Sequence, residues 1–210
     1  MKSVLAIERI LQSAVLHGDV AAVVRADRVA DLRRDLDALG RDNALNDYQR
    51  FLIEDVLRFD PPDLAFAPRS IVVIATPSLA ARMTLTWQGK GVTVMIPPGY
   101  VGDTTAPDRI ARYQNEVLGP LGYRVEAAPR LPRKLLAVRS GLARYGRNNI
   151  CYVEGMGSLL SLYAFYSDVP CEDGAWHALR HLDSCDACEA CVRACPTGAI
   201  LPDRFLIDNT

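Results

Sequence analysis

The chain has 210 residues, half of them apolar, with 24 Lys and Arg against 25 Asp and Glu and a formal net charge of -1. Such a chain can bury one sizeable core with a small appended module, or form two modest domains. The balanced charge excludes a protein that is basic throughout, so the overall composition does not favour nucleic-acid binding.

The longest apolar stretches, such as Ser158 to Phe165, fall well short of the ~20 residues that a membrane-crossing helix needs. Glu8 and Arg9 interrupt the apolar runs near the N-terminus, so a secretory signal is not expected. Four of the six cysteines lie within eleven residues, whereas a secreted disulfide scaffold scatters its cysteines along the chain. We therefore expect a cytoplasmic protein with no membrane segment.

The first third of the chain is predicted to be mostly helical. Apolar residues recur at helical spacing from Lys2 to Val15 and again from Arg25 to Leu39, where Gly40 stands at the position of a C-terminal cap. Residues 51–59 extend the helical region until two prolines end it. These patterns predict amphipathic surface helices.

The middle of the chain alternates predicted strands and helices. The β-branched run Ile71 to Ala75 predicts a buried central strand. Further strands are expected at residues 91–96 and 123–127, helices at 107–118 and 131–139, and a strand pair at 150–153 and 158–166. The pattern predicts an α/β or α+β layered domain, which we place at residues 1–174.

The strongest motif is a run of four cysteines followed by a proline, namely Cys185, Cys188, Cys191 and Cys195 with Pro196. A C-x2-C-x2-C loop wraps three thiolates around one iron-sulfur cluster, and in two-cluster ferredoxins the fourth cysteine binds the other cluster. Zinc sites usually bring cysteines as separated pairs, so zinc is the weaker alternative, as is a set of unligated thiols. The spacing predicts a 4Fe-4S ferredoxin-type module over residues 175–210.

This module is expected to be incomplete. A second cysteine run should follow residues 196–200, which we expect to form a short strand, but the sequence ends at Thr210. In a complete chain the fourth ligand would have to be Cys151 or Cys171, each of which is more simply explained as a small buried hydrophobe. We therefore expect one cluster here, or two in the complete protein.

The segment from Leu135 to Asp168, together with the cysteine run, resembles the epoxyqueuosine reductase family. In that family a helix leads into an A-G-L-G-x-x-G-K-N/H segment, a strand, a Gly-Ser turn, a strand ending in Thr-Asp and a double-cluster ferredoxin module. The matching residues here are Ser140-Gly141-Leu142, Gly146, Asn148, Gly157-Ser158 and Ser167-Asp168. The resemblance covers Val125 to Ile200, and the N-terminal half matches only in broad character.

The resemblance implies a flavin-reductase-like layered domain that holds a cobalamin beside the nearer cluster, so that electrons pass through the corrinoid to a bound substrate. The implied cofactor-binding residues are Gly141, Gly146, Asn148, Gly157 and Ser158, although glycines also serve tight turns. The implied partners are an electron donor such as a ferredoxin or flavodoxin and a small-molecule or modified-nucleoside substrate. The alternative is a ferredoxin-like electron-transfer protein without substrate chemistry of its own.

The family's proton donor is an aspartate in a D-S-A-P segment, and its nearest counterpart here is Glu126, which begins Glu126-Ala127-Ala128-Pro129. The extra methylene of a glutamate displaces its carboxyl group, which weakens the case for a tRNA substrate. The near-neutral charge does not support tRNA either. Arg144, Tyr145 and Arg147 lie on the glycine turn, where they would meet an anionic ligand or form a solvated loop.

Overall fold

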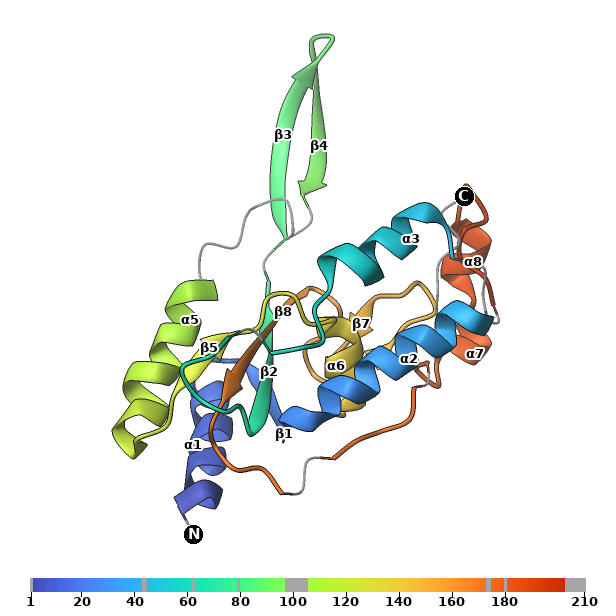
Figure 1. Ribbon diagram of the computed structural model, residues 1–210. Coiled ribbons are helices and arrows are strands. Elements are labelled where there is room, and N and C mark those ends of the chain that lie inside the picture. Colours follow the sequence, from blue (N-terminus) through green and yellow to red (C-terminus); the bar gives the residue numbers. More distant parts are fainter. Residues whose placement is uncertain are drawn as a thin grey trace.

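The computed structural model describes residues 2–42, 45–61, 63–78, 80–96, 106–172, 175–179 and 181–202. A four-stranded antiparallel sheet of order β1-β2-β8-β5 lies at its centre, with helices on both faces (Figure 1). Its strands are β1 (Val20–Arg25), β2 (Ser70–Pro77), β5 (Val125–Ala127) and β8 (Leu160–Ser167). The predicted mixed class is therefore confirmed, and the antiparallel pairing makes it α+β.

Helices and two small sheets make up the other regular elements of the described chain. The helices are α1 (Lys2–Leu16), α2 (Val29–Asp42), α3 (Asp47–Phe51), α5 (Ala106–Arg112), α6 (Arg133–Arg139), α7 (Cys185–Cys188) and α8 (Ala190–Ala194). Shorter helical turns are η1 (Ala26–Arg28), η2 (Leu52–Val56), η3 (Tyr113–Leu118) and η4 (Gly119–Leu121). The small sheets pair β3 (Ala81–Trp87) with β4 (Lys90–Ile96) and β6 (Arg144–Tyr145) with β7 (Cys151–Tyr152). Within the described part, every helix is too short or too polar to span a bilayer.

One face of the central sheet is covered by α1 and by η3, which continues α5. Ala6, Ile10 and Ala14 of α1 are fully buried, because residues four apart share one face of a helix. Tyr113 of η3 packs against Phe165 of β8 with ring centroids 5.2 Å apart. The helix predicted at the N-terminus is confirmed, and its apolar stripe is what attaches it to the sheet.

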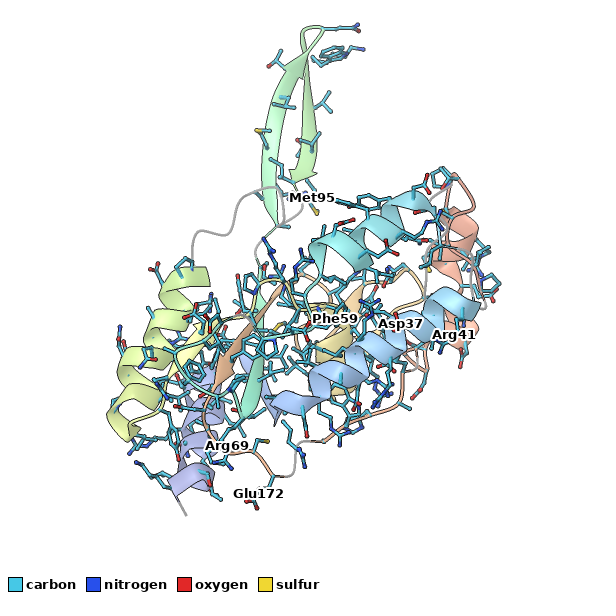
Figure 2. All side chains as sticks on the ribbon, viewed as in Figure 1. Asp37, Arg41, Phe59, Arg69, Met95 and Glu172 are labelled. Atoms are coloured by element: carbon cyan, nitrogen blue, oxygen red, sulfur yellow. The ribbon has the colours of Figure 1, made fainter. Side chains whose placement is uncertain are left out.

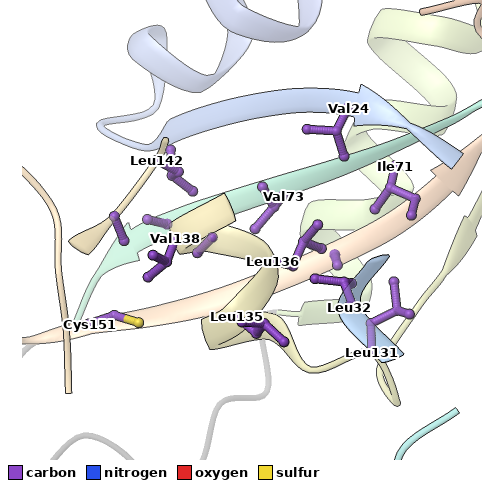
Figure 3. Packing of buried hydrophobic residues seen from close by; sticks show 14 of the residues in the cluster. Val24, Leu32, Ile71, Val73, Leu131, Leu135, Leu136, Val138, Leu142 and Cys151 are labelled. Atoms are coloured by element: carbon purple, nitrogen blue, oxygen red, sulfur yellow. The ribbon is translucent and has the colours of Figure 1, made fainter. Parts of the chain in front are cut away.

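The opposite face of the sheet is covered by α2 and α6. Leu32 of α2 and Leu136 of α6 are fully buried in one cluster with Ile71 and Val73 of β2 (Figure 3). β2 lies between β1 and β8 and is buried on both faces, which confirms the predicted central strand. Burying one such side chain contributes about 1.5–3 kcal/mol, so helices on both sides fix the sheet in place.

The β3–β4 hairpin projects away from the rest of the molecule (Figure 1). Gln88 and Gly89 have positive φ angles of 49° and 75°, as a two-residue type I′ turn requires. Its side chains extend outward along both strands (Figure 2), and Trp87 at the tip is 70% exposed. The sequence analysis expects β4 but does not expect β3. Apolar and polar residues alternate in β3, but almost all of its side chains are exposed, so the strand has no buried face.

Three local predictions need correction. The stretch from Arg25 is not a single helix ending at Gly40, because β1 and η1 precede α2 and α2 continues to Asp42. β7 and β8 do not pair with each other, since β7 pairs with β6 while β8 aligns over its full length with β2. The longer partner wins because it buries a whole row of apolar side chains. Residues 196–200 form turns rather than a strand.

The chain that leads to the cysteine run packs on the layered domain. Two guanidinium groups contact the Trp176 ring, with the central carbon of Arg28 5.5 Å and that of Arg139 5.8 Å from the ring centroid. Arg139 also pairs with Asp35 and donates to the carbonyl of His177 at 2.7 Å. The division into residues 1–174 and 175–210 stays a prediction, and residues 173–174 and 203–210 lie outside the described residues.

Candidate metal centre and neighbouring pocket

The predicted cysteine ligands lie on two short helices joined by a strained residue. Cys185 and Cys188 are the ends of α7, and Cys191 lies in α8. Glu189 joins the helices with a positive φ of 44°, a conformation that costs a non-glycine residue about 1–2 kcal/mol. Cys195 follows α8 in an extended conformation, as the proline after it requires. This backbone presents the thiols in the order that an iron-sulfur loop needs.

The donor set fits an iron-sulfur cluster by ligand type and order. All six cysteines of the chain are thiols, and those of the run are exposed or half-buried. Among the described residues, no three His, Cys, Asp or Glu side chains lie close enough together to hold a metal ion. Cluster assembly would therefore have to draw the thiolates together, as metal binding commonly does when it completes folding.

The cysteines differ in how readily they form thiolates. Hydrogen bonds from the Thr197 hydroxyl and from nearby backbone amides lower the pKa of Cys195 to about 7. Burial raises the pKa of Cys151 to about 11, and this residue lies in the hydrophobic core. Cys171 contacts the Val23 carbonyl of β1, with its sulfur 3.8 Å away. Cys151 therefore behaves as the buried hydrophobe that the sequence suggests.

The glycines of the family-like segment serve two different purposes. Gly141 has a φ of +77°, and a Cβ there would lie 2.6 Å from Nε2 of His177. A Cβ at Gly146 would lie 2.5 Å from the ring of Tyr152. Both glycines are thus explained by contacts within the chain. Gly157 has a φ of +76°, and a Cβ there would meet no atom within 4 Å, so its backbone conformation and not a close neighbour favours glycine.

Two pockets meet at the open edge of β8. β5 covers only the last three residues of β8, so the edge before them is not paired with a strand. A cavity of about 470 Å³ opens here and is lined by Asn149 and Ser158, and one of about 300 Å³ is lined by Glu126. Arg133 and Tyr163 line both cavities. The structure thus brings the predicted Ser158 and Glu126 to neighbouring pockets.

Some of these pocket residues carry no local sequence signal. Arg133 donates to the carbonyl of Leu162 on the open edge at 2.9 Å, which replaces a missing strand partner. Lys134 donates to the carbonyl of Asn149 at 3.0 Å. Sequence reasoning misses Arg133 and Lys134 because only the fold places them at the cavity.

The predicted residue Asn148 turns inward on its own loop, where its side-chain oxygen accepts from the Ile150 amide at 3.3 Å.

The loop of the β6–β7 hairpin connects the larger pocket to the cysteine run. Asn149 and Cys151 line the pocket, while Tyr145 accepts a hydrogen bond from the Leu182 amide at 2.8 Å. Arg147 pairs with Asp186 of α7 at 3.0 Å. Arg147 is therefore not part of a simple solvated loop, since it is buried and contacts the cysteine segment, whereas Arg144 is 48% exposed. Burial and then the charge of Arg147 lower the pKa of His181.

Comparison with known proteins agrees with the cysteine run and with the family resemblance. A family model described as a 4Fe-4S binding domain matches residues 180–201. The epoxyqueuosine reductase of Francisella cf. novicida (strain Fx1) is 31% identical over 100 residues, which are 47% of this chain and 27% of that protein. Over this segment the chain is similar to epoxyqueuosine reductases. The predicted resemblance is thus confirmed, over a segment that spans about a quarter of that curated relative.

Solved structures resemble this chain along almost its whole length. The epoxyqueuosine reductase of Streptococcus thermophilus has a TM-score of 0.59 at 16% identity, covering 99% of this chain and 56% of that one. An epoxyqueuosine reductase crystallised with a tRNA-Tyr epoxyqueuosine-modified stem loop has a TM-score of 0.58 at 17% identity, with coverages of 99% and 56%. The fold is therefore shared, and this chain spans about half the length of these proteins.

Proposed function

We propose that this chain is the cofactor- and substrate-binding part of a 4Fe-4S-dependent reductase of the epoxyqueuosine reductase type. The observation that carries the proposal is the β6–β7 loop, which forms one wall of the larger pocket and holds the cysteine segment through Leu182 and Asp186. Redox cofactors exchange electrons efficiently only when they lie close together, and the protein supplies that placement. A shared loop is a direct way to supply it.

Cys185, Cys188 and Cys191 would hold one cluster, and Cys195 would contribute to a second. Such a cluster supplies electrons at low potential. The protein's own residues provide the thiolates, and the exposed positions of α7 and α8 leave them accessible for assembly. The electron donor in this proposal is a ferredoxin or flavodoxin.

The pocket residues suit a large, partly polar ligand such as cobalamin. Ser158 offers a hydroxyl and Asn149 an amide to the larger pocket, and the backbone at Gly157 is open to close approach. Glu126 lines the neighbouring pocket and is exposed, so it could give a proton to a substrate bound there. Because one related enzyme was crystallised with a modified tRNA stem loop, a modified nucleoside in RNA is the proposed substrate class.

The proposal can be tested on the full chain after anaerobic reconstitution with iron and sulfide. We expect bound iron and sulfide, a spectral change when cobalamin is added, and conversion of an epoxyqueuosine-containing stem loop in the presence of a reductant. Glu126→Gln should lower kcat about 10²–10⁴-fold with little change in KM. Glu116→Gln, at an exposed carboxylate of η3, is the matched control and should not. Cluster reduction without cobalamin binding would instead favour a plain electron-transfer protein.

A further inference from the structure

Arg147 is a buried cation placed between the pocket loop and the cysteine helix. Its side chain is only 9% exposed, and one terminal nitrogen donates to a carboxylate oxygen of Asp186 at 3.0 Å. The other terminal nitrogen donates to the carbonyl of Pro202, beyond the last cysteine. Arg147 therefore contacts both ends of the cysteine segment, which begins in α7 and ends near Pro202.

The neighbouring Arg144 provides a contrast. It pairs with Asp183 at 3.2 Å, but its side chain is 48% exposed and that of Asp183 is 83% exposed. Exposed pairs of this kind contribute ~0–1 kcal/mol and are screened by salt. Nε of Arg147, by comparison, is buried and has no hydrogen-bond partner among the described atoms. Of these two arginines, Arg147 is the buried one, and its two terminal nitrogens contact both ends of the cysteine segment.

The charge of Arg147 is not fully balanced. Its carboxylate partner is 78% exposed, so water screens the negative charge more than the positive one. The residue that it holds, Asp186, lies between the ligands Cys185 and Cys188. A fixed positive charge beside an iron-sulfur cluster stabilises the reduced form, which carries one more negative charge.

We propose that Arg147 is a positioning residue that fixes the first cluster loop against the pocket wall and raises the reduction potential of the cluster held there. This inference rests on the proposed function, because it assumes that Cys185, Cys188 and Cys191 bind a cluster. The inference gives a role to Arg147, which lies on the glycine turn and is not among the residues that line the two pockets described above. Arg147 holds the cluster loop through hydrogen bonds and changes the potential through its charge. The first effect is measured by hydrogen exchange and the second by the midpoint potential.

The experiment compares the reconstituted full chain with Arg147→Gln, Asp186→Asn and the control Arg144→Gln. Two quantities are measured: the midpoint potential of the cluster by anaerobic titration, and the hydrogen-exchange protection of residues 181–195 in the cluster-free protein. Removing the cation should shift the potential to more negative values, and removing its partner carboxylate should shift it to more positive values. Both variants should reduce protection at least tenfold, because each breaks the same contact, whereas Arg144→Gln should change neither quantity.

The possible outcomes separate this inference from the proposed function. Opposite shifts in potential with bound cluster, together with reduced protection in both variants, support both the charge role and the holding role of Arg147. Potentials and protection that do not respond in either variant, with the cluster still bound, would overturn it and leave the proposed function intact. A wild-type chain that binds no cluster would overturn the proposed function. The hydrogen-exchange data on the cluster-free protein would then still decide whether Arg147 holds the cysteine segment. Asp186→Asn changes an exposed residue, so it remains informative if Arg147→Gln does not fold.

Discussion

Replacing Asp19 by asparagine should destabilise the layered domain strongly. The Asp19 side chain is 1% exposed, and its two oxygens each accept from Arg109 at 3.0 Å while one also accepts from Arg112 at 3.2 Å. Two unit charges 3.0 Å apart attract by about 5.5 kcal/mol at an effective dielectric constant of about 20, and desolvation offsets part of this. Without the carboxylate, Arg109 and Arg112, which are 22% and 15% exposed, lose the negative charge that they share. We expect a loss of about 3–5 kcal/mol in the free energy of unfolding.

Urea unfolding followed by circular dichroism measures this loss as a lower midpoint at an unchanged slope. The matched control is Asp27→Asn, because the side chains of the Arg25–Asp27 pair are 48% and 59% exposed. That change should cost no more than about 1 kcal/mol. Equal losses in the two variants would refute the argument that burial makes the Asp19 cluster important. Arg109 also lies 5.8 Å from the Tyr163 ring, so Asp19→Asn should weaken ligand binding at the adjoining pockets.

Other predictions concern the cysteine segment and the hairpin. Glu189→Gly should increase the hydrogen-exchange protection of the cluster-free α7–α8 segment by about 1 kcal/mol, because it relieves a positive φ of 44°, whereas Glu189→Ala should not. In reduced cluster-free protein, Cys195 should react with iodoacetamide with a rate that rises through a midpoint near pH 7, since its lowered pKa populates the thiolate there. Cys151, with a pKa of about 11, should react at neutral pH only after unfolding, and equal rates for the two thiols would contradict this. Replacing Ala81–Ile96 by Asn-Gly should change the free energy of unfolding by less than about 1 kcal/mol in urea titrations, because an isolated hairpin is only marginally stable and this one stands away from the core. A larger decrease in the free energy of unfolding would mean that the hairpin packs on the layered domain.

The cysteine site is the part that local sequence predicts best. Ligand order and the proline that ends α8 depend on residues a few positions apart, and the structure follows them at Cys185 to Cys195. The sequence does not predict how the thiols lie before assembly, since side-chain convergence depends on the metal. The match over residues 180–201 agrees with the ligand run, while the catalytic role of Glu126 stays a prediction.

The glycine turn is a case in which sequence and structure each supply half of the explanation. The pattern of Gly141 and Gly146 marks the segment as family-like, but the pattern alone allows either a ligand cradle or tight turns. The neighbours that explain these glycines are His177, which is far along the chain, and Tyr152 on the paired strand. A close approach of this kind cannot be deduced before the partner is known.

The sequence by itself determined the elements that local pattern governs, namely the helix at the N-terminus, the buried strand at Ile71 to Ala75 and the cysteine run. Periodicity and ligand spacing are properties of neighbouring residues, so they are visible in one dimension. Only the tertiary structure decided that β8 pairs with β2 and that Arg147 meets Asp186. Such contacts join segments that are remote in sequence. Packing selects them by burying whole apolar rows and the Arg147 side chain, and neither leaves a local signature in the sequence.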